Sequence, residues 1–179
     1  IKKYEIDCVF ISHKENQGIC KTYNEGVRLC EGKYYSTLSC DDVLLPNKTS
    51  SQVIFFEGKT EDVGMIYSDA EVRNVLTEEI NPSFIRKHRG NSDKPSGDIF
   101  DHLIEKNFIP AMSILVRKKV FDILGGFDEE LIFEDYDFFL RVAAKYKILY
   151  LDGDFVIYKI HRDNFNLKML QTSGYNWSL

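Results

Sequence analysis

The sequence is poor in the residues and patterns that mark several protein classes. Among its 179 residues there are only four cysteines and four prolines. No apolar run approaches the roughly 18 residues of a membrane-spanning helix. The cysteines, at positions 8, 20, 30 and 40, fit no zinc-site or CxxC spacing, and residues 1–5 lack the apolar core of a signal peptide. We therefore expect four free thiols, a cytoplasmic location and no transmembrane segment.

What is present is the composition of one globular domain. Hydrophobic residues make up 44% of the chain and charged residues 28%, close to the globular average, and a chain of this length can bury a core without cross-links. The net charge of −5 argues against a nucleic-acid partner. A metal or phosphorylated ligand would therefore need a local site. We predict a single domain over 1–179, whose tail, 162–179, follows no assignable pattern.

Short apolar runs alternate with helical periodicities along the chain. Strands are predicted at residues 5–11, 33–38, 63–67, 112–116, 148–151 and 155–160, and helices at 19–30, 47–56, 98–106, 118–124 and 136–146. Gly32 suits a left-handed helix cap, Asp152-Gly153 predicts a hairpin, and 81–97 is read as a long surface loop. The alternation predicts an α/β sandwich with a mostly parallel central sheet and helices on both faces.

Two acidic features stand where such a fold places ligands, beyond the carboxyl ends of strands. Asp41 and Asp42 follow a predicted strand directly. Hard divalent cations take carboxylate ligands, and magnesium commonly combines one or two of them with substrate phosphates. Aspartate is also a good turn former, so the pair could simply begin the next segment. Both interpretations stay open on the residues alone.

The second acidic feature is the stretch 128–137, which has six acids and no base. Acids in a first helical turn favour the helix dipole, so a capping role explains the stretch. The other interpretation is a carboxylate general base held at a rigid helix start. His161, after the last predicted strand, is either a structural histidine or a contact to metal or phosphate.

Read in order, several segments resemble the family 2 glycosyltransferases, whose fold is the GT-A nucleotide-sugar-binding sandwich. The resemblance covers roughly residues 1–165. It rests on residues 15–18 (ENQG) with 23–26 (YNEG), 32–35 (GKYY) with 41–46 (DDVLLP), 125–129 (GGFDE), 134–141 (EDYDFFLR) and 160–161 (IH).

The resemblance implies a role for each matching residue. Asp41 takes the position of the metal-binding aspartate, and His161 that of the histidine that can reach the metal, manganese or magnesium. Asp135 takes the position of the general base, with Glu134 beside it in an orienting or acceptor-binding role. Donor contacts are implied for Gly18, Asn24, Ser39 and Asp42. Ser39 stands where the family has an aspartate, and Tyr23 where it has an arginine.

The implied activity is inverting transfer of a sugar from a nucleotide-diphosphate donor, a UDP-sugar, to a glycan or lipid-linked acceptor in cell-envelope polysaccharide synthesis. A lipid-linked acceptor would bring peripheral association with a membrane. The QxxRW motif of processive synthases is absent, since Asn176 precedes Trp177. The expected reaction is therefore non-processive.

The resemblance also implies that the family's first strand-helix-strand unit, which binds the nucleoside base, is missing, so that 1–179 is a partial domain. The sheet edge exposed there would be open to pairing with a second chain. The alternative function is a non-catalytic module of the same fold that binds a sugar or a partner. A nucleotidyltransferase is disfavoured because no GxGxxG phosphate loop is present.

Overall fold

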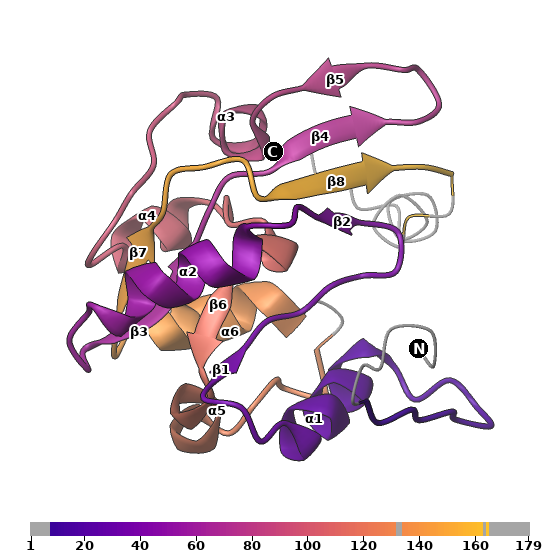
Figure 1. Ribbon diagram of the computed structural model, residues 1–179, viewed down its shortest axis with the longest axis vertical. Helices are drawn as coiled ribbons and strands as arrows, with labels where there is room; N and C mark the ends of the chain where they lie inside the picture. Colours follow the sequence, from indigo (N-terminus) through magenta and orange to yellow (C-terminus); the bar gives the residue numbers. More distant parts are fainter. Residues whose placement is uncertain (1–7, 132–133, 163, 165–179) are drawn as a thin grey trace.

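The computed structural model describes residues 8–131, 134–162 and 164. Two four-stranded sheets form its framework (Figure 1). In the first sheet, β6 (Leu115–Arg117) lies between β1 (Tyr34–Tyr35) and β3 (Val63–Tyr67), and β7 (Lys147–Tyr150) follows β3. In the second, the order is β2 (Val43–Leu44), β8 (Val156–Ile160), β4 (Glu71–Asn74) and β5 (Ile80–Asn81).

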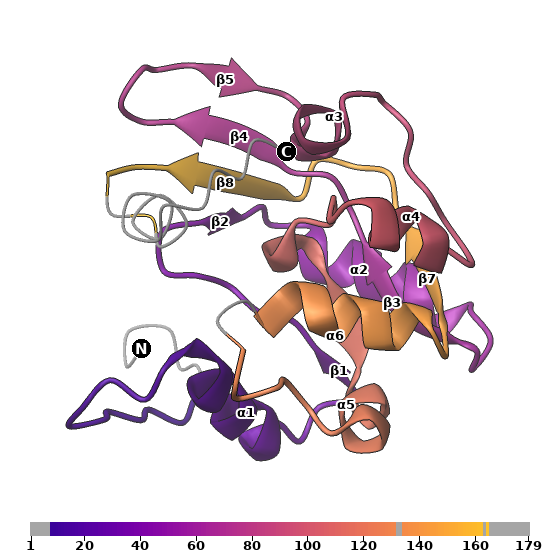
Figure 2. The ribbon, with the colours of Figure 1, turned by 180° about the vertical axis from the view of Figure 1, so that it is seen from behind.

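Helices cover both faces of the first sheet, as Figures 1 and 2 show from opposite sides. On one face lies α2 (Lys48–Glu57), whose Phe56 packs with Ile66 of β3. On the other lie α4 (Phe100–Glu105) and α6 (Glu134–Ala143), with Phe138 packed near Met65 of β3. Residues 65 and 66 point to opposite faces because side chains alternate along a strand. The described structure is completed by α1 (Ile19–Leu29), α3 (Phe84–Arg89), α5 (Lys118–Leu124) and the 3-10 turn Ala111–Ser113.

The α/β class is confirmed, but the pairing is mixed rather than mostly parallel. β3 and β7 pair in parallel, as do β4 and β8. β6 runs antiparallel to both β1 and β3, and β2 runs antiparallel to β8. The sequence prediction failed here because the run at 112–116 carries no sign of its direction.

The hairpin predicted at Asp152-Gly153 is wrong. β7 and β8 belong to different sheets, and Gly153, with φ of 146°, lies between them. The chain turns there from the first sheet into the second, just as it does between β3 and β4. Parallel pairing of β7 with β3, and of β8 with β4, replaces the hairpin ladder that the turn residues indicated.

Two other local predictions are wrong. Residues 8–11 of the strand expected at 5–11 are irregular, and Val9 and Phe10 are 72% and 81% exposed; residues 5–7 lie outside the described part. A β-branched run forms a strand only where a neighbouring strand offers ladder partners. The loop expected at 81–97 contains α3, whose N-cap is Ser83, and the Ser83 hydroxyl accepts from the Arg86 amide. The helix ends at Gly90 with φ of 78°.

Several predictions agree closely with the structure. The strand at 63–67 and the helix at 118–124 match in their bounds, and the other helices differ by a few residues. One detail is wrong: the C-cap of α1 is Cys30, in extended backbone, and Gly32 is not a left-handed cap of this helix. All four cysteines are free thiols. No helix in the described residues is long and apolar enough to cross a membrane.

Candidate active site

Asp41 and His161 meet at one end of the second sheet. Antiparallel pairing of β2 with β8 aligns Val43 with Ile157, so the residues just before β2 lie beside those at the end of β8. There, Nε2 of His161 is 2.7 Å from Oδ2 of Asp41. The two residues are 120 positions apart in the sequence, and both side chains are 28% exposed. The structure therefore brings together the two residues that the resemblance assigned to the metal.

Asn164 is a third member of this cluster that the sequence analysis missed. Its Nδ2 donates to Oδ2 of Asp41 at 3.3 Å and to the carbonyl of Lys159 at 3.2 Å. Its Oδ1 accepts from the His161 amide, and the residue is 6% exposed. Asn164 thus holds the Asp41 carboxylate by its side chain and the His161 residue by its backbone amide. No periodicity marked it, because it lies in an irregular turn after the last strand.

Asp42 has a different environment from its neighbour. Its Oδ1 accepts from the backbone amide of Lys159 at 3.0 Å, which ties β2 to β8. Burial raises the pKa of Asp42 to about 6, and the nearby Asp41 charge adds to the rise. The Asp42 amide donates to the carbonyl of Ser39 at 3.3 Å, so 39–42 form a turn in which Ser39 is exposed. Each interpretation of the acidic pair therefore has a matching feature in the structure. Asp42 closes a turn, as a turn former would, and the Asp41 carboxylate faces the His161 imidazole, as a metal ligand would.

Within the described part of the chain, this cluster offers a pair of protein ligands to a metal. Among the described residues, no group of three or more His, Cys, Asp or Glu side chains is arranged to hold a metal ion. Asp41 and His161 offer one carboxylate and one imidazole. Such a pair suits a cation whose remaining ligands come from substrate phosphates and water.

The second acidic feature forms the first turn of α6. Glu134, Asp135 and Asp137 all lie in that turn, where they favour the helix dipole. Oδ1 of Asp135 accepts from the Tyr136 amide at 2.7 Å. Burial raises the pKa of Asp135 above its usual range. Burial also raises the pKa of Glu134 to about 7, with a further rise from Asp135. The first turn of α6 thus holds two acids in a poorly hydrated place. The general-base role of Asp135 stays a prediction.

Asn24 makes its contacts to a loop rather than to open solvent. Its Nδ2 donates to the Phe127 carbonyl and its Oδ1 accepts from the Phe127 amide, both at 2.9 Å. Nδ2 also donates to Glu129 at 3.1 Å. Asn24 therefore fixes the GGFDE loop to α1. Gly18, with φ of 83°, is the N-cap of α1, and no side-chain hydrogen bond caps the helix there. The donor roles of both residues stay predictions.

A surface cavity of about 330 Å³ opens beside α1. It is lined by residues of α1 and the loops around it, which are His13, Gln17, Lys21, Glu25, Arg28 and Glu129. His13 Nε2 lies 2.6 Å from Glu25 there. The cavity contains neither Asp41 nor Asp135, so it is not the site described above.

Comparison with known proteins identifies the family of this chain. Residues 7–177 match the family described as glycosyltransferase-like family 2. The chain belongs to this family. A glycosyltransferase of Methanocaldococcus jannaschii is 26% identical over 94% of this chain and 57% of its own length. The amylovoran biosynthesis glycosyltransferase AmsE of Erwinia amylovora is 24% identical over 76% of this chain and 48% of its own length.

Solved structures place this glycosyltransferase-like domain in the GT-A fold. The S. aureus protein TarS, residues 1–349, superposes with a TM-score of 0.59 at 16% identity, covering 82% of this chain and 42% of that one. A second structure of the same fragment, in complex with UDP-GlcNAc, gives 0.59 at 15% identity over 83% and 40% of the two chains. The family 2 chain thus spans about half the length of the proteins that it resembles here.

Proposed function

We propose that this chain carries catalytic residues of an inverting, non-processive glycosyltransferase that uses a nucleotide-diphosphate sugar. The observation that carries the proposal is the contact of Asp41 with His161, since two residues 120 positions apart converge at one point. Family membership supports the reaction class, and the UDP-GlcNAc complex of TarS supports a UDP-sugar donor.

The acceptor that we propose is a glycan or a lipid-linked sugar. The relative named for amylovoran biosynthesis supports a role in polysaccharide synthesis. The four free cysteines support a reducing, cytoplasmic compartment.

The donor set at Asp41 fits a divalent cation, manganese or magnesium. A carboxylate oxygen and an imidazole nitrogen lie on one side, and Asn164 holds the carboxylate in place. Asp42 fits less well as a metal ligand, because its Oδ1 is committed to the Lys159 amide, and we assign it to the donor instead. When bound, the cation would neutralise charge that develops on the diphosphate leaving group.

The chain's own residues supply acid–base chemistry. In the proposed reaction, the acceptor oxygen forms a bond to the anomeric carbon as the bond from that carbon to the diphosphate oxygen breaks. Asp135 takes the proton of the acceptor hydroxyl, and its raised pKa makes it a stronger base than an exposed aspartate. Attack from the face opposite the leaving group inverts the carbon. Glu134 binds the acceptor beside Asp135, while Gly18, Asn24 and Ser39 line the donor side.

Calorimetric titration of UDP with manganese into three variants tests the assignment. We expect Asp41→Asn to lose the manganese dependence of UDP binding, because one ligand oxygen loses its charge. Asp42→Asn is the matched control, since an amide oxygen can still accept from Lys159 and the manganese dependence should persist. Asp135→Asn should bind UDP nearly as well as the parent chain.

The same titration separates the outcomes. If UDP binds equally well with and without manganese in the parent chain, the metal assignment to Asp41 and His161 is wrong. If neither this chain nor a version extended at its N-terminus binds UDP, the catalytic proposal fails, and the alternative of a non-catalytic sugar- or partner-binding module gains support.

A further inference from the structure

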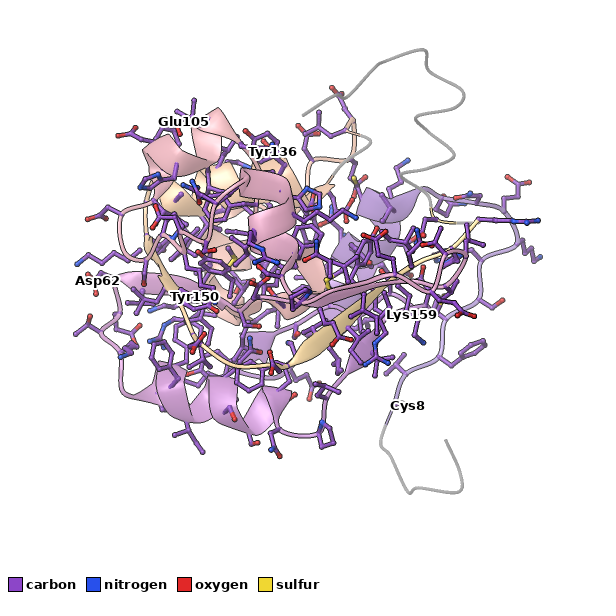
Figure 3. All side chains as sticks on the ribbon, turned by 90° about the horizontal axis from the view of Figure 1, so that it is seen from above. Cys8, Asp62, Glu105, Tyr136, Tyr150 and Lys159 are labelled. Carbon is purple, nitrogen blue, oxygen red and sulfur yellow. The ribbon has the colours of Figure 1, made fainter. Side chains whose placement is uncertain are left out.

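A cationic pocket lies at the end of the first sheet that is remote from Asp41. It has a volume of about 220 Å³ and is lined by Lys33, Glu61, Arg117, Lys118 and Lys119. The start of β1, the end of β6 and the loop after α2 converge there, toward the lower left of Figure 1. In Figure 3, Asp62, the neighbour of Glu61, lies on one side of the molecule, and Lys159, which contacts Asp42, lies on the other. Four cations face one carboxylate, in a chain whose net charge is −5.

The pocket is built on a rigid, buried cation. The Arg117 side chain is 5% exposed. Its Nε donates to the Val63 carbonyl at 2.9 Å and its Nη2 to the Lys59 carbonyl at 3.2 Å. The guanidinium also lies 4.6 Å from the centre of the Phe56 ring. These contacts hold the charge in place, so a ligand would find it already oriented.

The lysines are also positioned by the sheet. The Lys118 amide donates to the Lys33 carbonyl at 2.9 Å, which sets the two residues side by side. The outer carboxylates are those of Glu57, which accepts from Lys33, and Asp122, which accepts from Lys118. Glu57 and Asp122 do not line the pocket, whose own carboxylate is that of Glu61.

Glu61 is the acidic residue that lines the pocket, and it pairs with two of the cations. One of its oxygens is 3.4 Å from Nη1 of Arg117, and the other contacts the Lys119 ammonium. The Glu61 side chain is 72% exposed, so it can rotate into water at little cost. When Glu61 has turned away, the four cations face only the carboxylates of Glu57 and Asp122. The excess of two positive charges matches a phosphate group, which carries between about −1.5 and −2 at neutral pH.

We propose that this pocket, at Arg117, Lys118 and Lys119, binds a phosphate group that displaces the Glu61 carboxylate. The group can belong to a soluble phosphate monoester or to the monoester headgroup of a lipid such as phosphatidic acid, because both present the same tetrahedral anion of nearly two charges. The site is separate from Asp41 and His161, so it holds whether or not the chain transfers sugars.

Titration of inorganic phosphate into the purified chain, followed by NMR shifts of backbone amides, tests the site. Lys119→Ala should weaken binding by about two- to fivefold, the upper part of the range for one exposed ion pair. Glu61→Gln should tighten it, because a competing anion is removed. Lys14→Ala is the matched control, an exposed lysine in the loop before α1, and should leave binding unchanged. All binding should weaken as salt is added.

Vesicle sedimentation distinguishes the two sources of the phosphate. Binding to vesicles that contain phosphatidic acid but not to phosphatidylcholine vesicles, lost in Lys119→Ala, assigns the site to a lipid phosphate monoester. Saturable binding of inorganic phosphate without vesicle binding assigns it to a soluble ligand. The proposal is overturned if neither probe binds, or if Lys119→Ala and Glu61→Gln behave like Lys14→Ala while their thermal unfolding matches the parent chain.

Discussion

At the residue scale, two adjacent glycines illustrate how differently neighbouring positions can be constrained. Gly125 and Gly126 both have positive φ, 86° and 79°. A Cβ on Gly125 would meet open space, whereas one on Gly126 would lie 2.7 Å from Oδ1 of Asn24. That oxygen accepts from the Phe127 amide, so a side chain at 126 would push apart the contact that fixes the loop to α1.

The pair gives a matched test of loop geometry. Gly125→Ala should lower the free energy of unfolding by about 1–2 kcal/mol, the cost of left-handed backbone. Gly126→Ala should lower it by about 2–4 kcal/mol, because the Asn24 hydrogen bonds are disturbed as well, at about 1 kcal/mol each. Urea denaturation of both variants measures the difference. Equal losses would mean that Asn24 relaxes freely and does not clamp the loop.

Glu134 should make stability depend on pH. Its usual pKa is 4.5, and burial raises it to about 7 in the folded chain. The folded chain therefore keeps a proton that the unfolded chain releases, so the free energy of unfolding falls as pH rises from about 4.5 to 7. Glu134→Gln cannot ionise and should become progressively more stable than the parent over that range.

Denaturation curves at several pH values measure this difference. Glu130→Gln, an exposed acid in the same stretch, is the control and should run parallel to the parent. If Glu134→Gln also runs parallel, the Glu134 carboxyl is better hydrated than its surroundings indicate.

The candidate site could be predicted from the sequence only where a side chain belongs to a recognisable motif. Asp41 and His161 were identified by resemblance, and their contact in the structure is consistent with a shared role. Asn164 could not be found, because its contacts depend on how an irregular turn folds back over β8. The resemblance assigns Asn24 a donor contact, yet its partners in the structure are the Phe127 backbone and the Glu129 carboxylate, which no residue pattern specifies.

At the scale of elements, α2 docks through polar as well as apolar contacts. Lys48 is 1% exposed, and its Nζ donates to Oγ of Ser36 and to the Ile114 carbonyl. One turn later, Gln52 donates to the Ser113 carbonyl at 2.6 Å. Both side chains hold the segment that leads into β6. The helix itself was predictable, but a buried lysine was not, since lysine usually marks the solvent face.

Lys48 should leave a second pH signature. Burial lowers its pKa from 10.5 to about 8. Above pH 8 the folded chain has lost a proton that the unfolded chain retains to about 10.5, so the free energy of unfolding rises with pH in that window. Lys48→Met should lack this rise when its unfolding curves are compared with those of the parent. Lys21→Met, an exposed control, should retain it, and a rise that persisted in Lys48→Met would assign it to another group.

The predictions of two other elements were wrong because strand pairing depends on residues distant in the sequence. The apolar run at 8–11 has the composition of a strand but no neighbouring strand among the described residues. The Asp152-Gly153 turn has hairpin residues, but the flanking strands β7 and β8 pair with β3 and β4 and not with each other. Strand pairing is a property of the assembled sheets, whereas periodicity reports only which face is buried.

At the scale of the molecule, stability should be unevenly distributed between the two sheets. All five residues of β3 are buried, with neighbours on both sides. β2 has two half-buried residues at the edge of the second sheet. Amide hydrogen exchange measured by NMR should therefore be slowest in β3 and fast in β2, where only local opening is needed. Comparable protection in both strands would show that the second sheet opens only with the whole fold.

The pairing of β2 with β8 also has a consequence for synthesis in the cell. β2 has β8 as its only described neighbour, and the contact between Asp41 and His161 spans 120 positions. At ribosomal speeds of about 5–20 residues per second, the wait between the two residues is roughly 6–24 s. During that time Asp41 has been made but its histidine partner does not yet exist. While those 120 residues are being made, the nascent chain therefore exists without this end of the molecule assembled.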